Sequence, residues 1–198
     1  MKNKKIAFFD FDGTLTSADT FGLFARFSVG RLRYFSAVIK SVPDLFRWKT
    51  GRITNSDAKQ RLFSRLYKGR SKEWFEEKGA LFAQVIDRYL NPKGMQLLAT
   101  HRREGYDLCI VSASLSPWIL PWARENNIQA VIATEPEYDS RTRLTGRFST
   151  PNCHGTEKIK RVEEAFPHLE SDFSEKVAYG DSKSDLHLIR FVGSGKLI

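Results

Sequence analysis

The sequence predicts an α/β fold in which a three-layer parallel sheet carries an inserted all-helical segment. Short apolar runs alternate with helical patterns near both ends of the chain, as is typical of parallel sheets with helices on both faces. The stretch 17–92 has helical periodicity and no strand pattern. We therefore expect a core formed by 1–16 and 93–198, with 17–92 as a helical cap.

The first predicted strand, Ile6 to Phe9, runs directly into two aspartates, Asp10 and Asp12. Carboxylates next to a buried strand are costly unless they are paired or bind a metal ion. An Asp-Gly pair after a strand is also common in ordinary turns. These residues alone leave both interpretations open.

The inserted segment predicts about four helices. Apolar and aromatic side chains recur every three or four positions from Phe21 to Val42, and Pro43 interrupts them. The later elements are a short run at 45–48, a helix capped by Asn55 or Ser56, and a helix capped by Ser71 and ended by Asn91-Pro92.

From Lys93 onward, helices and strands alternate. The expected elements are a helix at 95–104, a strand at 107–111, a helix at 116–125, a strand at 130–133, a hairpin within 135–150, a helix at 156–166, a strand at 177–179, a helix at 185–191 and a last strand near 196–198.

Composition narrows the class of protein. The chain has 198 residues, of which 41% are hydrophobic, so it can form one sizeable core. No apolar run approaches the about 20 residues of a membrane span. The apolar run behind the basic start, Met1 to Lys5, is too short for a signal peptide. Cys109 and Cys153 form no disulfide or zinc pattern, and we expect a cytoplasmic protein.

The positive charge of the chain is uneven. The net charge is +9, and residues 17–92 hold 15 Lys and Arg against 7 Asp and Glu, a surplus of +8. Anionic substrates, a membrane surface or nucleic acid could be the partner, or the charge could simply face water. No nucleic-acid recognition motif is present, so we do not expect that partner.

Polar groups end three of the predicted strands. They are Asp10 with Asp12, Ser112 with Ser114, and Asp181 with Asp185. In parallel sheets the carboxyl ends of the strands meet at one edge, where ligands bind. Clustered carboxylates suit Mg²⁺, and Lys158 and the Ser112 hydroxyl would attract an anion. This set predicts a phosphoryl site.

These residues also resemble a known family. The run Asp10-Phe11-Asp12-Gly13-Thr14 resembles the first motif of the haloacid dehalogenase (HAD) superfamily. Ser112, Lys158 and the run 180–185 resemble its second, third and fourth motifs, in the same order. The inserted helices and residues 152–158 are similar to subfamily IB, the phosphoserine-phosphatase-like branch. The resemblance implies a Rossmann-like core with a helical cap.

The resemblance also implies catalytic roles. Asp10 would be the nucleophile that forms an aspartyl-phosphate, and Asp12 would be the general acid and base. Mg²⁺ would be held by Asp10, Asp181 and the backbone carbonyl of Asp12. The phosphate-binding residues would be Ser112, Ala113 and Lys158, with Asp185 and Thr14 supporting the site.

Substrate recognition is the least specific part of the resemblance. Asp19 stands where phosphoserine phosphatases have a glutamate, and Arg61 and Arg65 are the cap arginines nearest the expected position. The pattern Ser114-x-Ser116-Pro117 resembles a branch that contains lipid-phosphate phosphatases. The substrate is therefore expected to be a small phosphorylated metabolite or a phospholipid head group.

Other functions remain open at this stage. The same site could belong to a phosphoserine phosphatase proper, to a phosphotransferase or mutase, or to a non-catalytic module that binds anions or membranes. Residues 26–52 contain seven Lys and Arg and one acid, interleaved with aromatic side chains. Such a stretch is compatible with peripheral contact with an anionic membrane, or with a cap whose aromatics pack inward.

Overall fold

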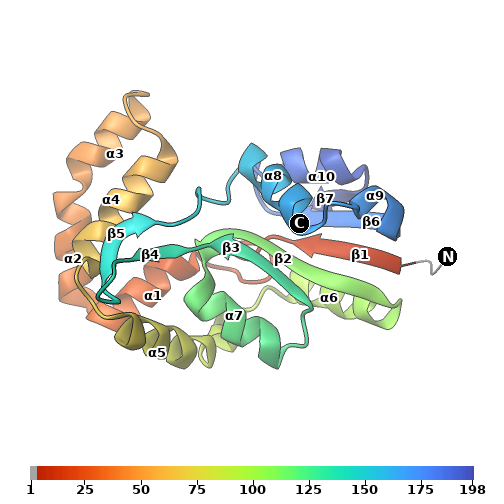
Figure 1. Ribbon diagram of the computed structural model, residues 1–198, viewed down its shortest axis with the longest axis horizontal. Coiled ribbons are helices and arrows are strands. Elements are labelled where there is room, and N and C mark those ends of the chain that lie inside the picture. Colours follow the sequence, from red (N-terminus) through yellow and green to blue (C-terminus); the bar gives the residue numbers. More distant parts are fainter. Residues whose placement is uncertain (1–3) are drawn as a thin grey trace.

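The structure is a computed structural model that describes residues 4–198. The first three residues of the predicted 1–16 segment lie outside the described residues. A parallel sheet with the strand order β3-β2-β1-β6-β7 forms the centre of the core (Figure 1). Its strands are β1 (Lys4–Phe9), β2 (Tyr106–Leu115), β3 (Ala130–Thr134), β6 (Phe173–Gly180) and β7 (Gly195–Leu197).

Helices cover both faces of this sheet (Figure 1). One layer is α6 (Pro92–Arg103) and α7 (Ser116–Glu125), and the other is α8 (Thr156–Ala165), α9 (Leu169–Asp172) and α10 (Leu186–Val192). Alternate residues of β1 point to opposite faces, so Ala7 and Phe9 join one hydrophobic cluster, and Ile6 and Phe8 join the other. The predicted three-layer α/β fold is confirmed.

The cap has more helices than the sequence predicts. They are α1 (Thr20–Val29), α2 (Arg31–Lys40), α3 (Val42–Lys49), α4 (Asn55–Tyr67), α5 (Lys72–Ala83) and the short 3-10 helix η1 (Ile86–Tyr89). Gly30, at φ +82°, separates α1 from α2. Ser71 caps α5 as predicted, whereas α4 is capped by Thr54, through a capping box with Asp57. No helix in 4–198 has the length and apolar character that a membrane span requires.

Aromatic packing joins the cap to the core. Trp118 of α7 stacks on Phe24 of α1 with ring centroids 4.4 Å apart, and both side chains are fully buried. On α5, a Cβ at Gly79 would lie 2.3 Å from the carbonyl oxygen of Pro117, so only glycine allows this approach of α5 to α7. The cap and one face of the sheet therefore share a hydrophobic core.

The predicted hairpin at 135–150 is present as β4 (Pro136–Tyr138) and β5 (Leu144–Phe148), but it lies against the cap. The amide of Gly69 donates to the carbonyl of Leu144 at 2.8 Å, and Phe148 donates to the side chain of Gln60 on α4 at 3.0 Å. Part of the segment assigned to the core, 93–198, therefore completes the cap.

Candidate active site

A buried lysine holds two carboxylates together at the carboxyl edge of the sheet. Lys158, in the first turn of α8, donates to Asp10 Oδ1 at 2.6 Å and to Asp185 Oδ1 at 2.5 Å. Lys158 is 2% exposed, Asp10 7% and Asp185 3%. The sequence predicts that these residues meet, and the structure brings them into direct contact.

Burial and the neighbouring charges have opposing effects on the pKa of Asp10 and on the pKa of Lys158. Burial raises the pKa of Asp10 above its ordinary value, although the charge of Lys158 opposes the shift. Burial would lower the pKa of Lys158, but the charges of Asp10 and Asp185 outweigh it, and the pKa is raised. Lys158 therefore remains an ammonium across the neutral range.

Asp181 brings a third carboxylate to the site. Oxygen atoms of Asp10, Asp181 and Asp185 lie within 4.8 Å of one another. Burial, and then the charge of Asp185, raise the pKa of Asp181. The loop after β1 closes tightly on this group, because a Cβ at Gly13 would lie 2.1 Å from Asp181 Oδ2. Gly13 also has φ +82°, a conformation that favours glycine.

Asp185 is fully engaged by its neighbours. Its Oδ1 accepts from Lys158, and its Oδ2 accepts from the amide of Ser182 at 3.1 Å and from the Ser182 hydroxyl at 2.7 Å. These bonds fix the carboxylate beside Lys158. Asp185 is therefore placed to orient Lys158, as the resemblance implies.

The Asp12 side chain turns away from this cluster and toward the cap. Its Oδ1 accepts from the Thr20 amide at 3.0 Å and from the Thr20 hydroxyl at 2.6 Å, while Oδ2 accepts from the Ser114 hydroxyl. Trp118 Nε1 in turn donates to the Thr20 hydroxyl at 3.0 Å. Burial, followed by the charge of Asp19, raises the pKa of Asp12, which suits a group that donates a proton.

The remaining predicted residues of this edge lie around the aspartates. Ser112 is buried in β2, and its hydroxyl oxygen accepts from the Ser114 amide at 3.0 Å. It precedes the start of α7, at Ser116, by four positions. The Ala113 carbonyl accepts from Lys59 and Thr134. The buried Thr14 hydroxyl has no hydrogen-bond partner among the described residues.

Comparison with known proteins decides the family. The sequence model of the haloacid dehalogenase-like hydrolases matches residues 7–190, nearly the whole chain. This chain belongs to the haloacid dehalogenase-like hydrolases. It is 28% identical to Protein CicA of Caulobacter vibrioides (strain NA1000 / CB15N) over 182 residues, which cover 91% of this hydrolase and 80% of CicA.

Solved structures share the fold of this hydrolase. A protein with unknown function from Bordetella pertussis Tohama I has a TM-score of 0.78 at 26% identity, covering 98% of this chain and 89% of that chain. A phosphoserine phosphatase solved as a phospho-aspartyl intermediate analogue has a TM-score of 0.67 at 18% identity, covering 98% and 86%. The latter likeness is one of fold, and it includes the inserted cap.

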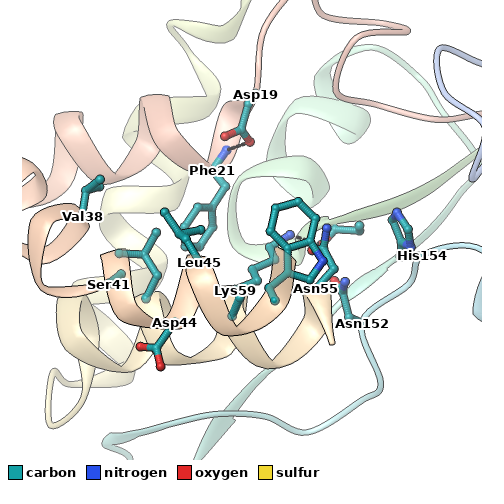
Figure 2. A pocket seen from close by; sticks show the side chains of 14 residues that line it. Asp19, Phe21, Val38, Ser41, Asp44, Leu45, Asn55, Lys59, Asn152 and His154 are labelled. Carbon is teal, nitrogen blue, oxygen red and sulfur yellow. Dashed lines mark hydrogen bonds between the residues drawn. The ribbon is translucent and has the colours of Figure 1, made fainter. Parts of the chain in front are cut away.

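A cavity of about 340 Å³ lies beside the carboxyl edge of the sheet, between the cap and the core (Figure 2). Asp10, Asp12, Asp181 and Asp185 do not line it. Its apolar lining comes from the cap, and its core side is formed by Ala113, Asn152 and His154. The cap residues are Asp19, Phe21, Val38, Ser41, Asp44, Leu45, Trp48, Asn55, Ala58, Lys59 and Leu62.

Lys59 lines this cavity and is not among the residues that the sequence predicts for the site. It reaches from α4 across the cavity and donates to the Ala113 carbonyl at 2.7 Å (Figure 2). Its ammonium also lies 5.4 Å from the centre of the Phe21 ring. Burial lowers the pKa of Lys59, while the charges of Asp12, Asp19 and Asp10 oppose the shift. Its position in the α4 periodicity, one turn after Asn55, was the available signal.

The structure does not bring Arg61 and Arg65 to the cavity. Both bind the buried carboxylate of Asp44, at 2.7 Å and 2.5 Å, and so fasten α3 to α4. The cavity face of α4 is formed by 55, 58, 59 and 62, and Arg61 follows Lys59 by about 200° around the helix axis. Asp19 lines the cavity, but its oxygens accept from the amides of Phe21 and Gly22 and cap α1.

The sequence does not predict the hydrogen bonds that the Asp12 side chain accepts from Thr20 and Ser114. Ser114 follows Ser112 by two positions on a strand, so both side chains share one face of β2, and this spacing was the available signal. For Thr20, only its place beside the α1 cap residue Asp19 pointed to the site.

Proposed function

We propose that this hydrolase is a Mg²⁺-dependent phosphatase, which cleaves a phosphomonoester through an aspartyl-phosphate on Asp10. The observation that carries the proposal is the buried Lys158 between Asp10 and Asp185, with Asp181 in the same cluster. Anionic ligands and a divalent cation are both suited to this arrangement.

The donor set fits Mg²⁺. Three carboxylates face one ammonium, so the cluster carries a net charge of −2 when all its groups are ionised. Burial raises the pKa of Asp10 and of Asp181, and a cation bound between them would stabilise their ionised forms. Asp10, Asp181 and the Asp12 carbonyl would hold the ion. When bound, Mg²⁺ supplies positive charge that offsets the negative charge on the phosphoryl oxygens.

The residues of the chain divide the reaction between them. An oxygen of Asp10 attacks phosphorus, the bond to the leaving oxygen breaks, and Asp12 gives that oxygen its proton. Asp12 then takes a proton from water, whose oxygen attacks phosphorus and releases phosphate and the Asp10 carboxylate. Lys158 binds a phosphoryl oxygen, and the Ser112 hydroxyl retains its own proton to donate to another. The phosphoserine phosphatase of similar fold, solved as a phospho-aspartyl intermediate analogue, supports this route.

Removal of the metal tests the proposal. We expect the protein to hydrolyse an aryl phosphate with Mg²⁺, to lose at least about 100-fold of that rate in excess EDTA, and to recover it when Mg²⁺ is restored. Calorimetric titration of the EDTA-treated protein should show Mg²⁺ binding. A rate that EDTA leaves unchanged contradicts metal dependence, and no hydrolysis of any phosphomonoester favours a non-catalytic anion-binding module.

The cavity favours a substrate with an apolar leaving group over a small polar metabolite. The cap side chains that line it are mostly apolar, with Lys59 as the cation nearest the core. Phosphoserine would need partners for an amino group and a carboxylate. Arg61 and Arg65 are instead bound to Asp44, and Asp19 caps α1. A lipid-like phosphomonoester is therefore the better candidate.

A series of linear alkyl phosphates tests this preference. Burial of each CH₂ contributes about 0.8 kcal/mol, so kcat/KM should rise by about threefold to fourfold per carbon until the cavity is filled. Leu62→Asn should flatten this rise, whereas Leu81→Asn on the exposed side of α5 should not. A higher kcat/KM for O-phosphoserine than for hexyl phosphate would instead identify a phosphoserine phosphatase proper.

A further inference from the structure

An apolar stripe runs along the outer side of α2 and α3, which together we term the α2–α3 arm (residues 31–49). Five of its side chains follow spacings of three and four residues: Leu32, Phe35, Ile39, Val42 and Phe46. Leu32 is 90% exposed, Ile39 70% and Phe46 64%. Within 4–198, seven of the ten exposed large apolar side chains belong to this arm. Exposed apolar surface on this scale indicates an interaction site.

Positive charge surrounds the stripe. The exposed basic residues of the arm and its following turn are Arg31, Arg33, Lys40, Arg47, Lys49 and Arg52. The one acidic residue in 31–52 is Asp44, which is buried and paired with Arg61, Arg65 and, at 3.6 Å, with Arg47 of the arm itself. The outward surface of the arm is therefore apolar and cationic.

The arm is held firmly from behind. Ala37, Ser41 and Asp44 are buried on its inner side, and Arg65 donates to both Ser41 and Asp44. The stripe therefore cannot turn inward without breaking these contacts. In the described part of the chain, no element covers it, and the arm lies at the end of the molecule opposite the start of β1 (Figure 1).

We propose that the α2–α3 arm docks on an anionic lipid bilayer, with the apolar stripe in the interface and the basic side chains at the lipid head groups. Apolar area and positive charge on one face are the two terms that drive interfacial binding. A second copy of the chain fits less well, because pairing two arms would bring two sets of basic side chains together. Leu45 and Trp48 of the arm also line the cavity, so its lining is continuous with the docking face.

Vesicle flotation tests the proposal with the whole protein. We expect at least about tenfold more protein to float with phosphatidylcholine vesicles containing about 30% phosphatidylglycerol than with pure phosphatidylcholine vesicles. Raising the salt to about 1 M shortens the screening length to about 3 Å and should release most of it. The double variant Ile39→Glu/Phe46→Glu should lose about tenfold in flotation, since carboxylates oppose both terms. The control Leu81→Glu, which places one carboxylate on the exposed side of α5, should float like the wild type.

Three results would overturn the proposal. The first is a wild type that fails to float with anionic vesicles. The second is a double variant that floats as well as the wild type. The third is a dimer that Ile39→Glu dissociates, which would assign the stripe to a second copy. Unchanged circular dichroism and aryl phosphatase rate would show that the double variant is folded. Docking does not depend on the proposed phosphatase activity. Asp10→Asn protein should therefore float normally, and failure of the hydrolysis assay would leave the docking result unaffected.

Discussion

Asp10→Asn is expected to lower kcat for aryl phosphate hydrolysis by about 10⁴-fold or more, because an amide cannot replace the attacking carboxylate. The side chain keeps its size, and Lys158 keeps its contact with Asp185. The fold should therefore survive. Without metal, the thermal midpoint should stay level or rise, since the substitution removes a buried charge from a crowded carboxylate cluster.

The matched control for this variant is Asp172→Asn, which makes the same change at an exposed position on α9. Its rate should equal that of the wild type. Comparable rates for Asp10→Asn and Asp172→Asn would rule out Asp10 as the nucleophile. A lower rate caused by unfolding would be recognised by a fall in the thermal midpoint of Asp10→Asn alone.

Lys158→Met is expected to damage both activity and stability. The variant preserves the length of the chain but leaves Asp10 and Asp185 without their shared cation. Loss of one partner from a buried ion pair costs about 3–5 kcal/mol, or roughly 6–20 °C in thermal midpoint for a chain of this size. We also expect a loss of about 10³-fold in kcat/KM, because no fixed charge would bind the phosphoryl oxygens.

Differential scanning fluorimetry with and without Mg²⁺ measures the stability effect. Mg²⁺ should partly reverse the fall in the thermal midpoint of Lys158→Met, since it supplies positive charge to the same carboxylates. Lys160→Met, on the exposed side of the same helix, is the control and should change neither quantity. A Lys158→Met midpoint equal to that of the control would show that the bridge contributes nothing to folding.

The sheet and the cluster at its carboxyl edge could be predicted from the sequence because both follow from local patterns. Apolar runs define the strands, and parallel topology brings their ends, with Asp10, Ser112 and Asp181, to one edge. Lys158 also reaches this edge as expected, although its exact partners, Asp10 and Asp185, depend on side-chain packing that no local pattern encodes.

The cap was less predictable, because the choice of helix face depends on distant partners. On α4, Lys59, Arg61 and Arg65 are all basic; the helix repeat separates Lys59 from the two arginines, but only the contacts with buried Asp44 show which face points away from the cavity. The hairpin was foreseen as a local element, but its place against α4 depends on backbone groups of Gly69 and Leu144, far apart in the sequence. Sequence periodicity contains no information on such pairings.

The hydrogen bonds to Asp12 connect its acidity to the position of the cap. Two of its hydrogen bonds come from Thr20, the first residue of α1 in the cap, and the third comes from Ser114 in the core. Each hydrogen bond to the carboxylate lowers the pKa of Asp12. A small movement of α1 that lengthened the bonds from Thr20 would therefore raise this pKa. Thr20 therefore couples the position of α1 in the cap to the acidity of Asp12.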